Sequence, residues 1–234
     1  LSEQGVREVL LLGQNITAYG LAELRAAGRS TRDVSPFADL LAAVNEVPEV
    51  SRIRFTSPHP RFMNQPFIEA VTGLPKVCEA FHIPLQSGSD RILRDMHRGY
   101  TVAEYRQCVR AIRSRLPQAT FSTDVIVGFP GETDQDFEST RRIMEDVGFE
   151  MAYIFKYSVR TGTKAAKWAD NVPREVKEER NRILLEDLER RTSTRNQRYL
   201  GETVEVLVEG VSKRNPERWT GRTRAAKVCL FEPG

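Results

Sequence analysis

Five short polar or glycine-containing segments each follow an apolar run of the sequence, and they hold the side chains best suited to chemistry. They are Gly13–Asn15, Thr56–Pro60, Gln86–Ser89, Gly128–Glu132 and Tyr157–Arg160. Each segment alone is compatible with an ordinary turn. Together, their amides and hydroxyls suit a ligand with several neutral polar groups and a carboxylate, which Arg160 could pair. The fourth segment lacks the Lys-Ser/Thr that ends a P-loop, so that motif does not indicate nucleoside-triphosphate binding.

Three histidines and one carboxylate are the candidates for acid–base work. We expect His59 to hydrogen-bond within its loop, His82 to be a satisfied interior histidine, and His97 to lie on the surface. Asp124 has two interpretations that the sequence leaves open. It is either a carboxylate that faces a ligand or the partner of Arg54 in a structural ion pair.

The elements that must position these residues belong to a globular α/β protein. Of 234 residues, 29% are charged and 40% are hydrophobic, and the formal net charge of +3 permits a nucleic-acid partner without requiring one. The apolar runs have the length of strands, so no membrane span is expected, and no signal-like start is present. Cys78, Cys108 and Cys229 match no disulfide framework and no zinc or iron–sulfur spacing, which favours a reducing cytoplasm.

Five strand-like runs alternate with helical patterns and predict a parallel sheet built from βα units. The runs are Val6–Leu12, Ile53–Thr56, Phe81–Leu85, Phe121–Val127 and Met151–Tyr157. Helix starts are predicted at Ser35-Pro36 and at the capping boxes Thr101–Glu104 and Thr133–Asp136. The five polar segments then lie at the carboxyl ends of strands, where the βα loops of barrel enzymes gather.

The strand patterns also predict which face is the inside. In the third run, Phe81 and Ile83 share one face, whereas His82 and Gln86 share the other. The fourth run alternates in the same way and has Asp124 on its polar face. The apolar face should meet the helices, and the polar face should line a cleft. Five units are too few for a closed eight-stranded barrel, so we expect an open barrel with a wet interior.

The character of the sequence changes after residue 172. Residues 173–200 combine a helical apolar stripe with many charges, which predicts a connecting helix with a solvated face. From Gly201 onward, an alternating strand pattern and a basic loop predict the start of a small β domain. Because the chain begins at Leu1 without a methionine and stops at Gly234 within a strand pattern, we expect it to be a piece of a longer protein.

Four of the strand-end motifs resemble those of the radical S-adenosylmethionine methylthiotransferases, in the same order and over nearly the whole chain. They are Leu11-Leu-Gly-Gln-Asn15, Arg52-Ile-Arg-Phe-Thr-Ser-Pro-His-Pro60, His82-Ile-Pro-Leu-Gln-Ser-Gly-Ser-Asp90 and Ser122-Thr-Asp-Val-Ile-Val-Gly-Phe-Pro-Gly-Glu-Thr133. The segments Tyr157-Ser158 and Arg160-Thr-Gly-Thr163 continue the match. The part from Gly201 onward resembles the TRAM domain of that family, a small RNA-binding β-barrel.

Within the family, the sequence looks most like the branch that acts on tRNA and methylthiolates N6-isopentenyladenosine next to the anticodon. The branches that act on threonylcarbamoyladenosine and on a ribosomal-protein aspartate stay open. The resemblance implies an open (β/α)6 TIM-like barrel, of which the five runs are strands two to six, followed by the start of an all-β TRAM domain. The implied division is a partial barrel in residues 1–172, a connecting helix in 173–200 and an incomplete TRAM domain in 201–234.

The resemblance implies S-adenosylmethionine as cofactor and two 4Fe-4S clusters in the full-length protein. Family members hold one cluster on a CxxxCxxC loop, and an electron from it cleaves S-adenosylmethionine to a radical that abstracts hydrogen from the substrate. The second cluster carries the sulfur, and an electron donor is needed. No CxxxCxxC occurs in this sequence, so we expect the chain alone to lack the cluster ligands and to be inactive.

The resemblance assigns the S-adenosylmethionine contacts to residues at the strand ends. From the methionine part to the adenine they are Gly13, Gln14, Asn15, Ser57, Gln86, Ser87, Asp124, Ile126, Gly128, Tyr157 and Ser158, with Arg160 toward the carboxylate or the substrate. The expected partner is the anticodon stem-loop of tRNA. Its phosphates would meet the basic side chains Lys213, Arg214, Arg218, Arg222, Arg224 and Lys227. Trp219 would stack on a splayed base or pack within the β domain.

Two other functions stay open. A degenerate barrel joined to a β module could be a non-catalytic RNA-binding protein. Alternatively, an ordinary barrel lyase or isomerase could use His59, His82 or Asp124. The strand-end motifs favour the methylthiotransferase over both.

Overall fold

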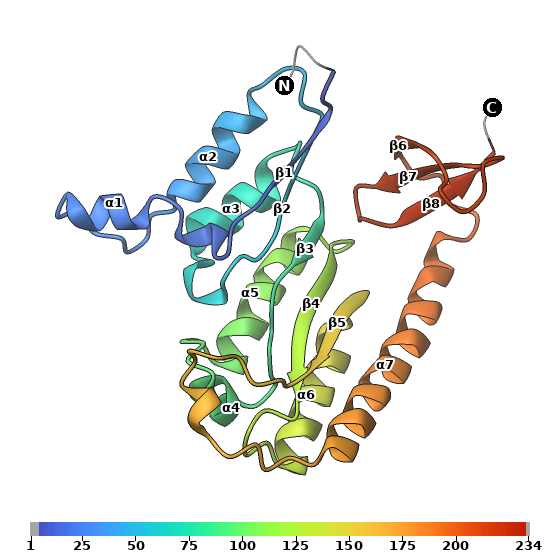
Figure 1. The fold of residues 1–234 in the computed structure, drawn as a ribbon. Helices are drawn as coiled ribbons and strands as arrows, with labels where there is room; N and C mark the ends of the chain where they lie inside the picture. Colours follow the sequence, from blue (N-terminus) through green and yellow to red (C-terminus); the bar gives the residue numbers. More distant parts are fainter. Residues whose placement is uncertain (1–4, 233–234) are drawn as a thin grey trace.

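Five parallel strands form the larger sheet of the computed structural model, which describes residues 5–232 (Figure 1). They are β1 (Glu8–Leu11), β2 (Arg52–Phe55), β3 (Ala80–His82), β4 (Thr120–Val127) and β5 (Met151–Lys156). β1 pairs with β2, and β3, β4 and β5 pair in that order. The isolated parallel bridges Ile53–Val77 and Thr56–His82 connect the two groups. The spatial order therefore follows the chain order, and the predicted open barrel is confirmed.

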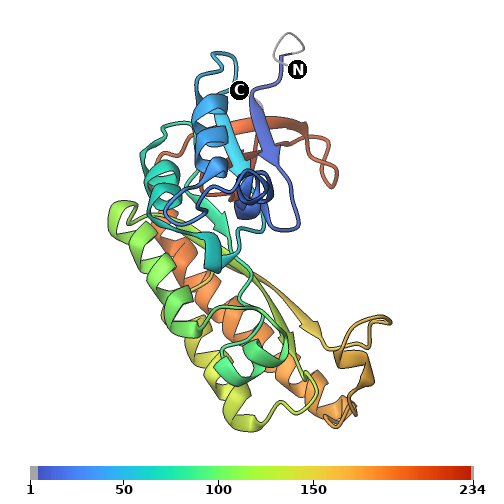
Figure 2. The same cartoon turned by 90° about the vertical axis from the view of Figure 1, so that its left-hand side faces the viewer.

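Seven α-helices within the described residues connect and cover these strands. They are α1 (Leu21–Ala26), α2 (Pro36–Asn45), α3 (Gln65–Gly73), α4 (Asp90–Asp95), α5 (Val102–Arg115), α6 (Asp134–Val147) and α7 (Arg174–Asn196). The predicted starts are confirmed, because Ser35 accepts a hydrogen bond from the Ala38 amide and both capping boxes are complete. Figure 2 shows α5, α6 and α7 side by side on one face of the sheet.

Short 3-10 turns complete the connections between these elements. They are η2 (Ile16–Ala18), η3 (Pro60–Phe62), η4 (Ala165–Lys167) and η5 (Gln197–Tyr199). Two of them, η2 and η3, follow the carboxyl ends of β1 and β2. Among the described residues, no helix is long and apolar enough to cross a membrane.

The face of the sheet that meets the helices is the apolar one, as the strand patterns predict. Phe81, Ile83 and Leu85 are each at most 1% exposed. The rings of Phe55, Phe81 and Phe121 continue this core, with centroids 6.1 and 5.8 Å apart in succession. The opposite face carries the half-buried side chains that line the interior of the open barrel.

β3 is shorter than the run Phe81–Leu85 that the sequence predicts. It ends at His82, because Pro84 has no amide hydrogen to donate to a neighbouring strand. The chain nevertheless stays beside β4. The Leu85 amide donates to the Thr123 hydroxyl at 2.9 Å, and that hydroxyl donates to the Ile83 carbonyl at 2.8 Å. The Thr123 hydroxyl thus replaces the backbone hydrogen bonds that the strands do not form here.

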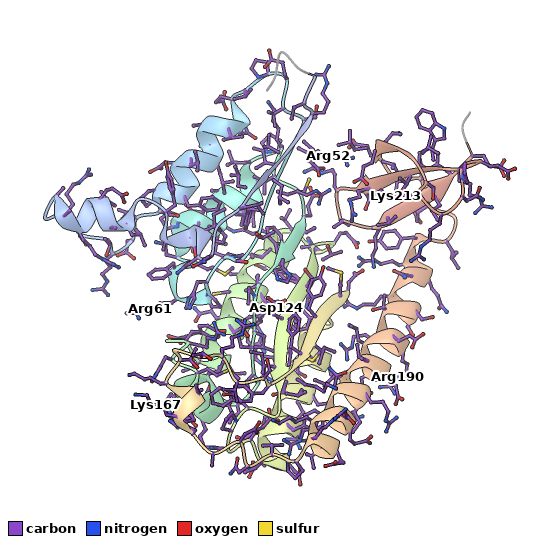
Figure 3. The ribbon with its side chains drawn as sticks, in the orientation of Figure 1. Arg52, Arg61, Asp124, Lys167, Arg190 and Lys213 are labelled. Atoms are coloured by element: carbon purple, nitrogen blue, oxygen red, sulfur yellow. The ribbon has the colours of Figure 1, made fainter. Side chains whose placement is uncertain are left out.

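The C-terminal residues form a separate antiparallel sheet of β6 (Val206–Val211), β7 (Trp219–Thr223) and β8 (Val228–Phe231). We call it the small sheet. It lies at the amino-terminal ends of the barrel strands, where Arg52 donates to the Arg222 carbonyl at 2.7 Å and Arg54 to the Thr223 carbonyl at 2.8 Å. Figure 3 shows Arg52 beside it. The small sheet therefore closes the end of the half-barrel opposite to the strand ends that carry the polar segments.

Candidate functional site

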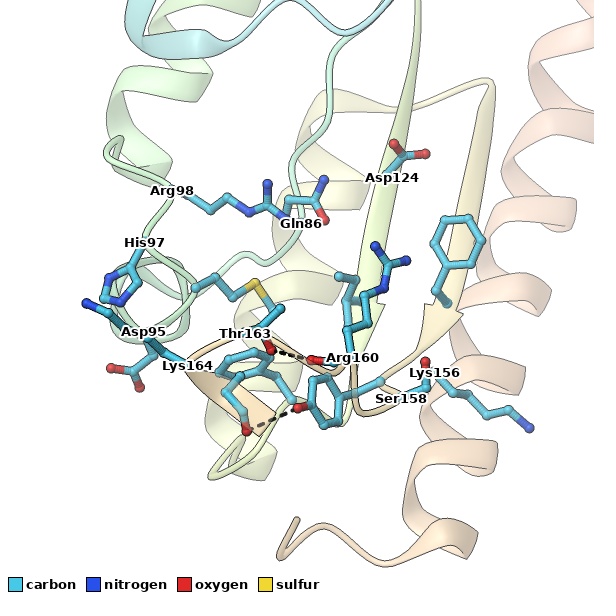
Figure 4. A pocket seen from close by; sticks show the side chains of 16 residues that line it. Gln86, Asp95, His97, Arg98, Asp124, Lys156, Ser158, Arg160, Thr163 and Lys164 are labelled. Atoms are coloured by element: carbon cyan, nitrogen blue, oxygen red, sulfur yellow. Dashed lines mark hydrogen bonds between the residues drawn. The ribbon is translucent and has the colours of Figure 1, made fainter. Parts of the chain in front are cut away.

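A cavity of about 560 Å³ opens at the carboxyl ends of β3, β4 and β5 (Figure 4). Half of the twelve residues predicted to contact S-adenosylmethionine line it, namely Gln86, Asp124, Ile126, Tyr157, Ser158 and Arg160. A hollow of about 180 Å³ adjoins it, since both share Gln86, Arg98 and Asp124, and Gln14 and Ser57 line this second space. Phe129 of the fourth segment also lines the larger space, so the structure brings all five predicted strand ends to one concave surface.

Asp124 lies on the inner face of β4, at the boundary between the two spaces. Its carboxylate is 3.4 Å from Nε2 of His82, whose Nδ1 lies 3.0 Å from the Ser122 hydroxyl. The interpretation of His82 as a satisfied interior histidine is confirmed. The alternative pairing of Asp124 with Arg54 is wrong, because Arg54 binds Glu8 at 3.0 Å and carbonyls of the small sheet. Asp124 is therefore available to a ligand.

Gln86 is held at the end of the β3 segment by its backbone rather than by its side chain. Its amide donates to the Asp124 carbonyl at 2.8 Å, and its carbonyl accepts from the Ile126 amide at 2.9 Å. Its φ is +65°, and Ser57 at the end of β2 has a φ of +58°. Non-glycine residues in this left-handed region are strained by about 1 kcal/mol or more, and such strain is concentrated at ligand sites.

One wall of the cavity is aromatic and comes from the loops after β4 and β5. The Phe129 ring meets the Tyr157 ring edge to face at 5.2 Å and the Trp168 ring at 5.7 Å. The Tyr157 hydroxyl donates to the Ala165 carbonyl at 3.3 Å, which is one of the two bonds drawn in Figure 4. With Ile126 beside it, this wall suits a flat heteroaromatic ring.

Four predicted contact residues do not line either space, and their surroundings give them other tasks. Ser87 is fully buried and accepts a hydrogen bond from the Ser89 amide at 3.2 Å. Asn15 accepts from the Thr17 hydroxyl at 3.1 Å, which organises the turn after β1. Gly13 belongs to the same turn, and a Cβ there would meet Ile16 Cα at 3.4 Å.

Gly128, the fourth of them, holds the loop after β4 against α7. Its φ is +72°, and a Cβ there would lie 2.9 Å from Lys177 Cδ. Its amide donates to the Glu132 carboxylate at 2.6 Å, and Arg180 of α7 donates to the same oxygen at 2.7 Å. Burial raises the pKa of Glu132, although the Gly128 amide and Arg180 oppose this shift. The loop and the long helix are therefore locked together behind the cavity.

The other two histidines occupy the positions that the sequence predicts. His59 hydrogen-bonds within its loop, where its Nδ1 accepts from the Arg61 amide at 3.3 Å at the start of η3. Burial, followed by the charges of Arg98 and Arg61, lowers the pKa of His59. His97 is exposed, but it lies at the rim of the larger cavity.

Sequence reasoning missed several cavity residues. They are Met96, Arg98, Phe129 and Lys164, which stand in loops without periodic patterns, and Phe155 of β5. The basic stretch around His97 was the only signal for Arg98. Phe155 carried a signal in its alternation with Tyr157 along the fifth strand-like run, because alternate residues share one face.

The donor set fits S-adenosylmethionine but not an iron–sulfur cluster. Asp124, Gln86 and Ser158 offer partners for hydroxyl and amino groups, and the Phe129 and Tyr157 rings offer an adenine surface. In residues 5–232, no group of three or more His, Cys, Asp or Glu side chains could hold a metal ion. Burial raises the pKa of the Cys78 thiol, and it raises the pKa of Cys108 to about 11. Both shifts disfavour the thiolate form that binds metals.

The basic residues of the small sheet divide into two groups. Lys213, Arg214 and Arg218 are exposed in the β6–β7 loop, next to the partly exposed Trp219. Arg222 pairs with Glu209 of the neighbouring strand at 2.9 Å, within the small sheet.

The second group faces the barrel. The Arg224 guanidinium pairs with Glu79 at 2.8 Å and donates to the Val77 carbonyl at 2.7 Å. Lys227 pairs with Glu150 and donates to Asn196 at 2.8 Å. These two cations hold the small sheet to the barrel.

Comparison with protein families matches the radical SAM superfamily over residues 1–144 and the TRAM domain over residues 197–234. The chain belongs to the radical SAM superfamily. Membership in this superfamily implies S-adenosylmethionine and a 4Fe-4S cluster as cofactors. The open parallel half-barrel and the cavity at its strand ends agree with it.

Among curated proteins, this radical SAM chain is similar to two named tRNA-2-methylthio-N(6)-dimethylallyladenosine synthase. It is 53% identical to the one from Opitutus terrae and 48% identical to the one from Acetivibrio thermocellus, over 99% of this chain and 47% of each relative. The chain spans about half the length of the curated relatives it matches. Among solved structures, it resembles coproporphyrinogen III oxidase (HemN) from Escherichia coli with a TM-score of 0.49 and 12% identity, over 93% of this chain and 67% of that one.

Proposed function

We propose that this chain is the barrel and RNA-binding part of a tRNA methylthiotransferase, which acts on N6-dimethylallyladenosine next to the anticodon. The observation that carries the proposal is the convergence of Gln14, Ser57, Gln86, Asp124 and Tyr157 on adjoining cavities in a radical SAM barrel. The names of the relatives at 53% and 48% identity favour the dimethylallyl branch over the other two branches. The setting of such an enzyme is the cytoplasm, where tRNA is modified.

The proposed organisation follows the expected division of the chain. Residues 1–172 form the partial barrel, 173–200 the connecting helix and 201–234 the TRAM part. The ligands of two 4Fe-4S clusters would come from other parts of the full-length protein, and a separate electron donor would reduce them. This assignment is supported by the 47% of each relative that the chain covers and by the absence of a CxxxCxxC motif from the chain.

Each residue has a proposed task in binding S-adenosylmethionine. Asp124 accepts hydrogen bonds from hydroxyl or amino groups, and Gln86 offers its side-chain amide beside it. Arg160 pairs with a carboxylate of the cofactor. The Tyr157 ring packs against the adenine, with Ile126 beside it. When bound, S-adenosylmethionine supplies the radical that activates the substrate carbon, and a second molecule supplies the methyl group. The residues of this chain hold and orient the cofactor.

The TRAM part is proposed to hold the anticodon stem-loop through phosphate contacts. Lys213, Arg214 and Arg218 are exposed and can meet phosphates, and Trp219 can stack on an unpaired base. Arg222, Arg224 and Lys227 already bind carboxylates of the protein. Arg222 stabilises the small sheet internally, whereas Arg224 and Lys227 orient it on the barrel.

The catalytic proposal is tested with the full-length gene in a bacterial strain that lacks its own tRNA methylthiotransferase. We expect the wild-type gene to restore 2-methylthio-N6-dimethylallyladenosine, measured by mass spectrometry of tRNA nucleosides. The variant Asp124→Asn should bind S-adenosylmethionine about tenfold more weakly or worse, because a carboxylate hydrogen bond is lost. Its iron content should stay normal.

The matched control is Asp39→Asn, which changes an exposed aspartate on α2. It should leave the affinity for S-adenosylmethionine unchanged. Failure of the wild-type gene to restore the modified nucleoside would refute the proposed function. Normal cofactor binding by Asp124→Asn would refute only the role of Asp124.

The RNA proposal predicts a specific loss of salt dependence. Replacing Lys213 by alanine should weaken binding of the tRNA anticodon stem-loop and lower the slope of log K against log salt by about one unit, since one phosphate contact is lost. The control Arg25→Ala removes an exposed cation from α1, which lies far from the small sheet in Figure 1. Equal slopes in the wild type and in Lys213→Ala would count against phosphate binding at this loop.

A further inference from the structure

The inner face of β5 exposes a row of large apolar side chains that the cofactor site does not fully use. Met151, Tyr153 and Phe155 alternate along the strand and are 46%, 52% and 52% exposed. Residues on the outer face of the same sheet behave differently, since Phe81 and Phe121 are each 1% exposed. We call Tyr153 and Phe155 the aromatic wall.

The aromatic wall is continuous with the cavity. In the parallel register, Tyr153 lies beside Asp124 and Phe155 beside Ile126, and both of these β4 residues line the cavity. Phe155 lines it too, whereas Tyr153 lies one step farther along the strand, toward the small sheet. A molecule that touches Tyr153 would therefore lie next to whatever fills the cavity.

The wall is also ordered for contact with a flat molecule. The rings of Tyr153 and Phe155 are nearly parallel, with an interplanar angle of 17° and centroids 6.4 Å apart. The His82 ring meets the Tyr153 ring edge to face at 6.0 Å. His82 is itself held by the Ser122 hydroxyl at 3.0 Å. It therefore packs against one edge of the Tyr153 ring and leaves the rest of that ring exposed.

The charges around the wall point to a nucleic acid as its occupant. Arg98 and Lys164 stand around the mouth of the same cavity and can meet phosphates. Unpaired bases in RNA are commonly recognised by stacking on aromatic side chains, with cations on the backbone. An apolar alkyl group on the base would add contact with Met151 and with the ring edges.

We propose that Tyr153, together with Phe155, is the surface that packs against the base and the N6-dimethylallyl group of the target adenosine. The wall thereby selects a prenylated adenosine over an unmodified one and sets the base beside the cofactor cavity. This inference rests on the proposed function, and it adds the residues that determine substrate specificity.

The test uses the full-length protein with its clusters reconstituted and two synthetic anticodon stem-loops. One carries N6-dimethylallyladenosine and the other carries adenosine at the same position. We expect the wild type to bind the prenylated RNA more tightly. Tyr153→Ala should lose about tenfold in affinity for the prenylated RNA, the change typical of removing one stacking aromatic. Its affinity for the unmodified RNA should change much less.

Two further variants separate contact from general damage. Tyr153→Phe keeps the ring and should retain the wild-type preference, whereas Tyr19→Ala removes an equally exposed tyrosine (53%) outside the cavity lining and should change nothing. Binding of S-adenosylmethionine, measured by calorimetry, should be the same in all variants.

The outcomes distinguish failure of the role of Tyr153 from failure of the proposed function. If the wild type neither binds nor modifies the prenylated RNA, the proposed function fails. If the wild type modifies it but Tyr153→Ala keeps the full preference, the inference alone fails. A uniform loss for both RNAs in Tyr153→Ala would also overturn it, because the wall would then cover another part of the protein or support the fold rather than contact the alkylated base.

Discussion

Hydrogen-bond partners decide which polar residues of the strand ends can serve a ligand. Ser87 and Gln86 are neighbours in the sequence. Ser87 is fully buried and accepts a hydrogen bond from the following turn, whereas Gln86 lines both spaces. Asp124 contacts His82 and still lines the cavity, because Arg54 binds Glu8 and a carbonyl of the small sheet instead. The motif locates the strand end, but the contacts of each side chain determine its task.

The lowered pKa of His59 predicts how the stability of the protein depends on pH. Burial and the charges of Arg98 and Arg61 lower its pKa in the folded state, so folding favours the neutral ring. The pKa of histidine in the unfolded chain is about 6.5, and above that pH His59 makes its full contribution to the free energy of unfolding. This contribution is lost as the pH falls through the lower pKa of the folded state. The urea midpoint of the wild type should therefore fall on going from about pH 7.5 to about pH 5.5.

The comparison variant is His59→Asn, which keeps a capping acceptor for the Arg61 amide but does not titrate. It should lose less stability over the same pH range. His97→Asn, at an exposed histidine, should behave like the wild type. An identical pH dependence in His59→Asn and the wild type would show that His59 does not carry the effect.

Among the elements, close backbone contacts fix the loops that carry the site. Gly88 begins the turn into α4 and lies directly against α6, where its amide donates to the Thr140 hydroxyl at 2.8 Å. A Cβ at this position would lie 2.5 Å from the Ser139 carbonyl oxygen, which belongs to a helix and has no room to move. This contact holds the loop after β3, and with it Gln86, at a fixed distance from β4.

The variant Gly88→Ala should therefore destabilise the protein by about 3 kcal/mol or more, because helix backbone must shift to admit the methyl group. Gly73→Ala is the matched control at the end of α3, where a Cβ would meet nothing within 4 Å. It should be neutral or stabilising by up to about 1 kcal/mol. Urea unfolding followed by circular dichroism measures both, and similar midpoints would contradict the close contact at Gly88.

At the scale of the whole molecule, the small sheet and the cavity lie at opposite ends of the barrel strands. The attachment uses charged groups, above all Arg224 with Glu79 and Lys227 with Glu150, rather than a shared apolar core. The exposed cations of the β6–β7 loop, Lys213, Arg214 and Arg218, take no part in this attachment.

Removing the Glu79 carboxylate should loosen the small sheet without unfolding the barrel. In Glu79→Gln, we expect a loss of about 1–2 kcal/mol and faster amide hydrogen exchange in β7 and β8, since Arg224 loses its charged partner and keeps only neutral acceptors. The control Glu209→Gln breaks the pair with Arg222 inside the small sheet and leaves the attachment intact. Unchanged exchange in Glu79→Gln would mean that other contacts hold the small sheet.

The sequence alone determined the order of strands and helices, the helix starts and the face of each strand that enters the core. These depend on local patterns, namely apolar alternation in Phe121–Val127 and capping boxes at Thr101 and Thr133, which act through neighbours in the chain. It also located the strand ends that carry the site, because parallel strands place those ends together.

Only the tertiary structure decided which residues share the cavity. Arg98 and Phe155 joined it, whereas Ser87 and Gly128 were taken up by contacts with α6 and α7 that are distant in sequence. The same reason applies to Arg224, which a basic loop suggested for RNA and which binds Glu79 instead. Such partners lie tens of residues apart, so their contacts depend on the packing of whole elements, which no local pattern records.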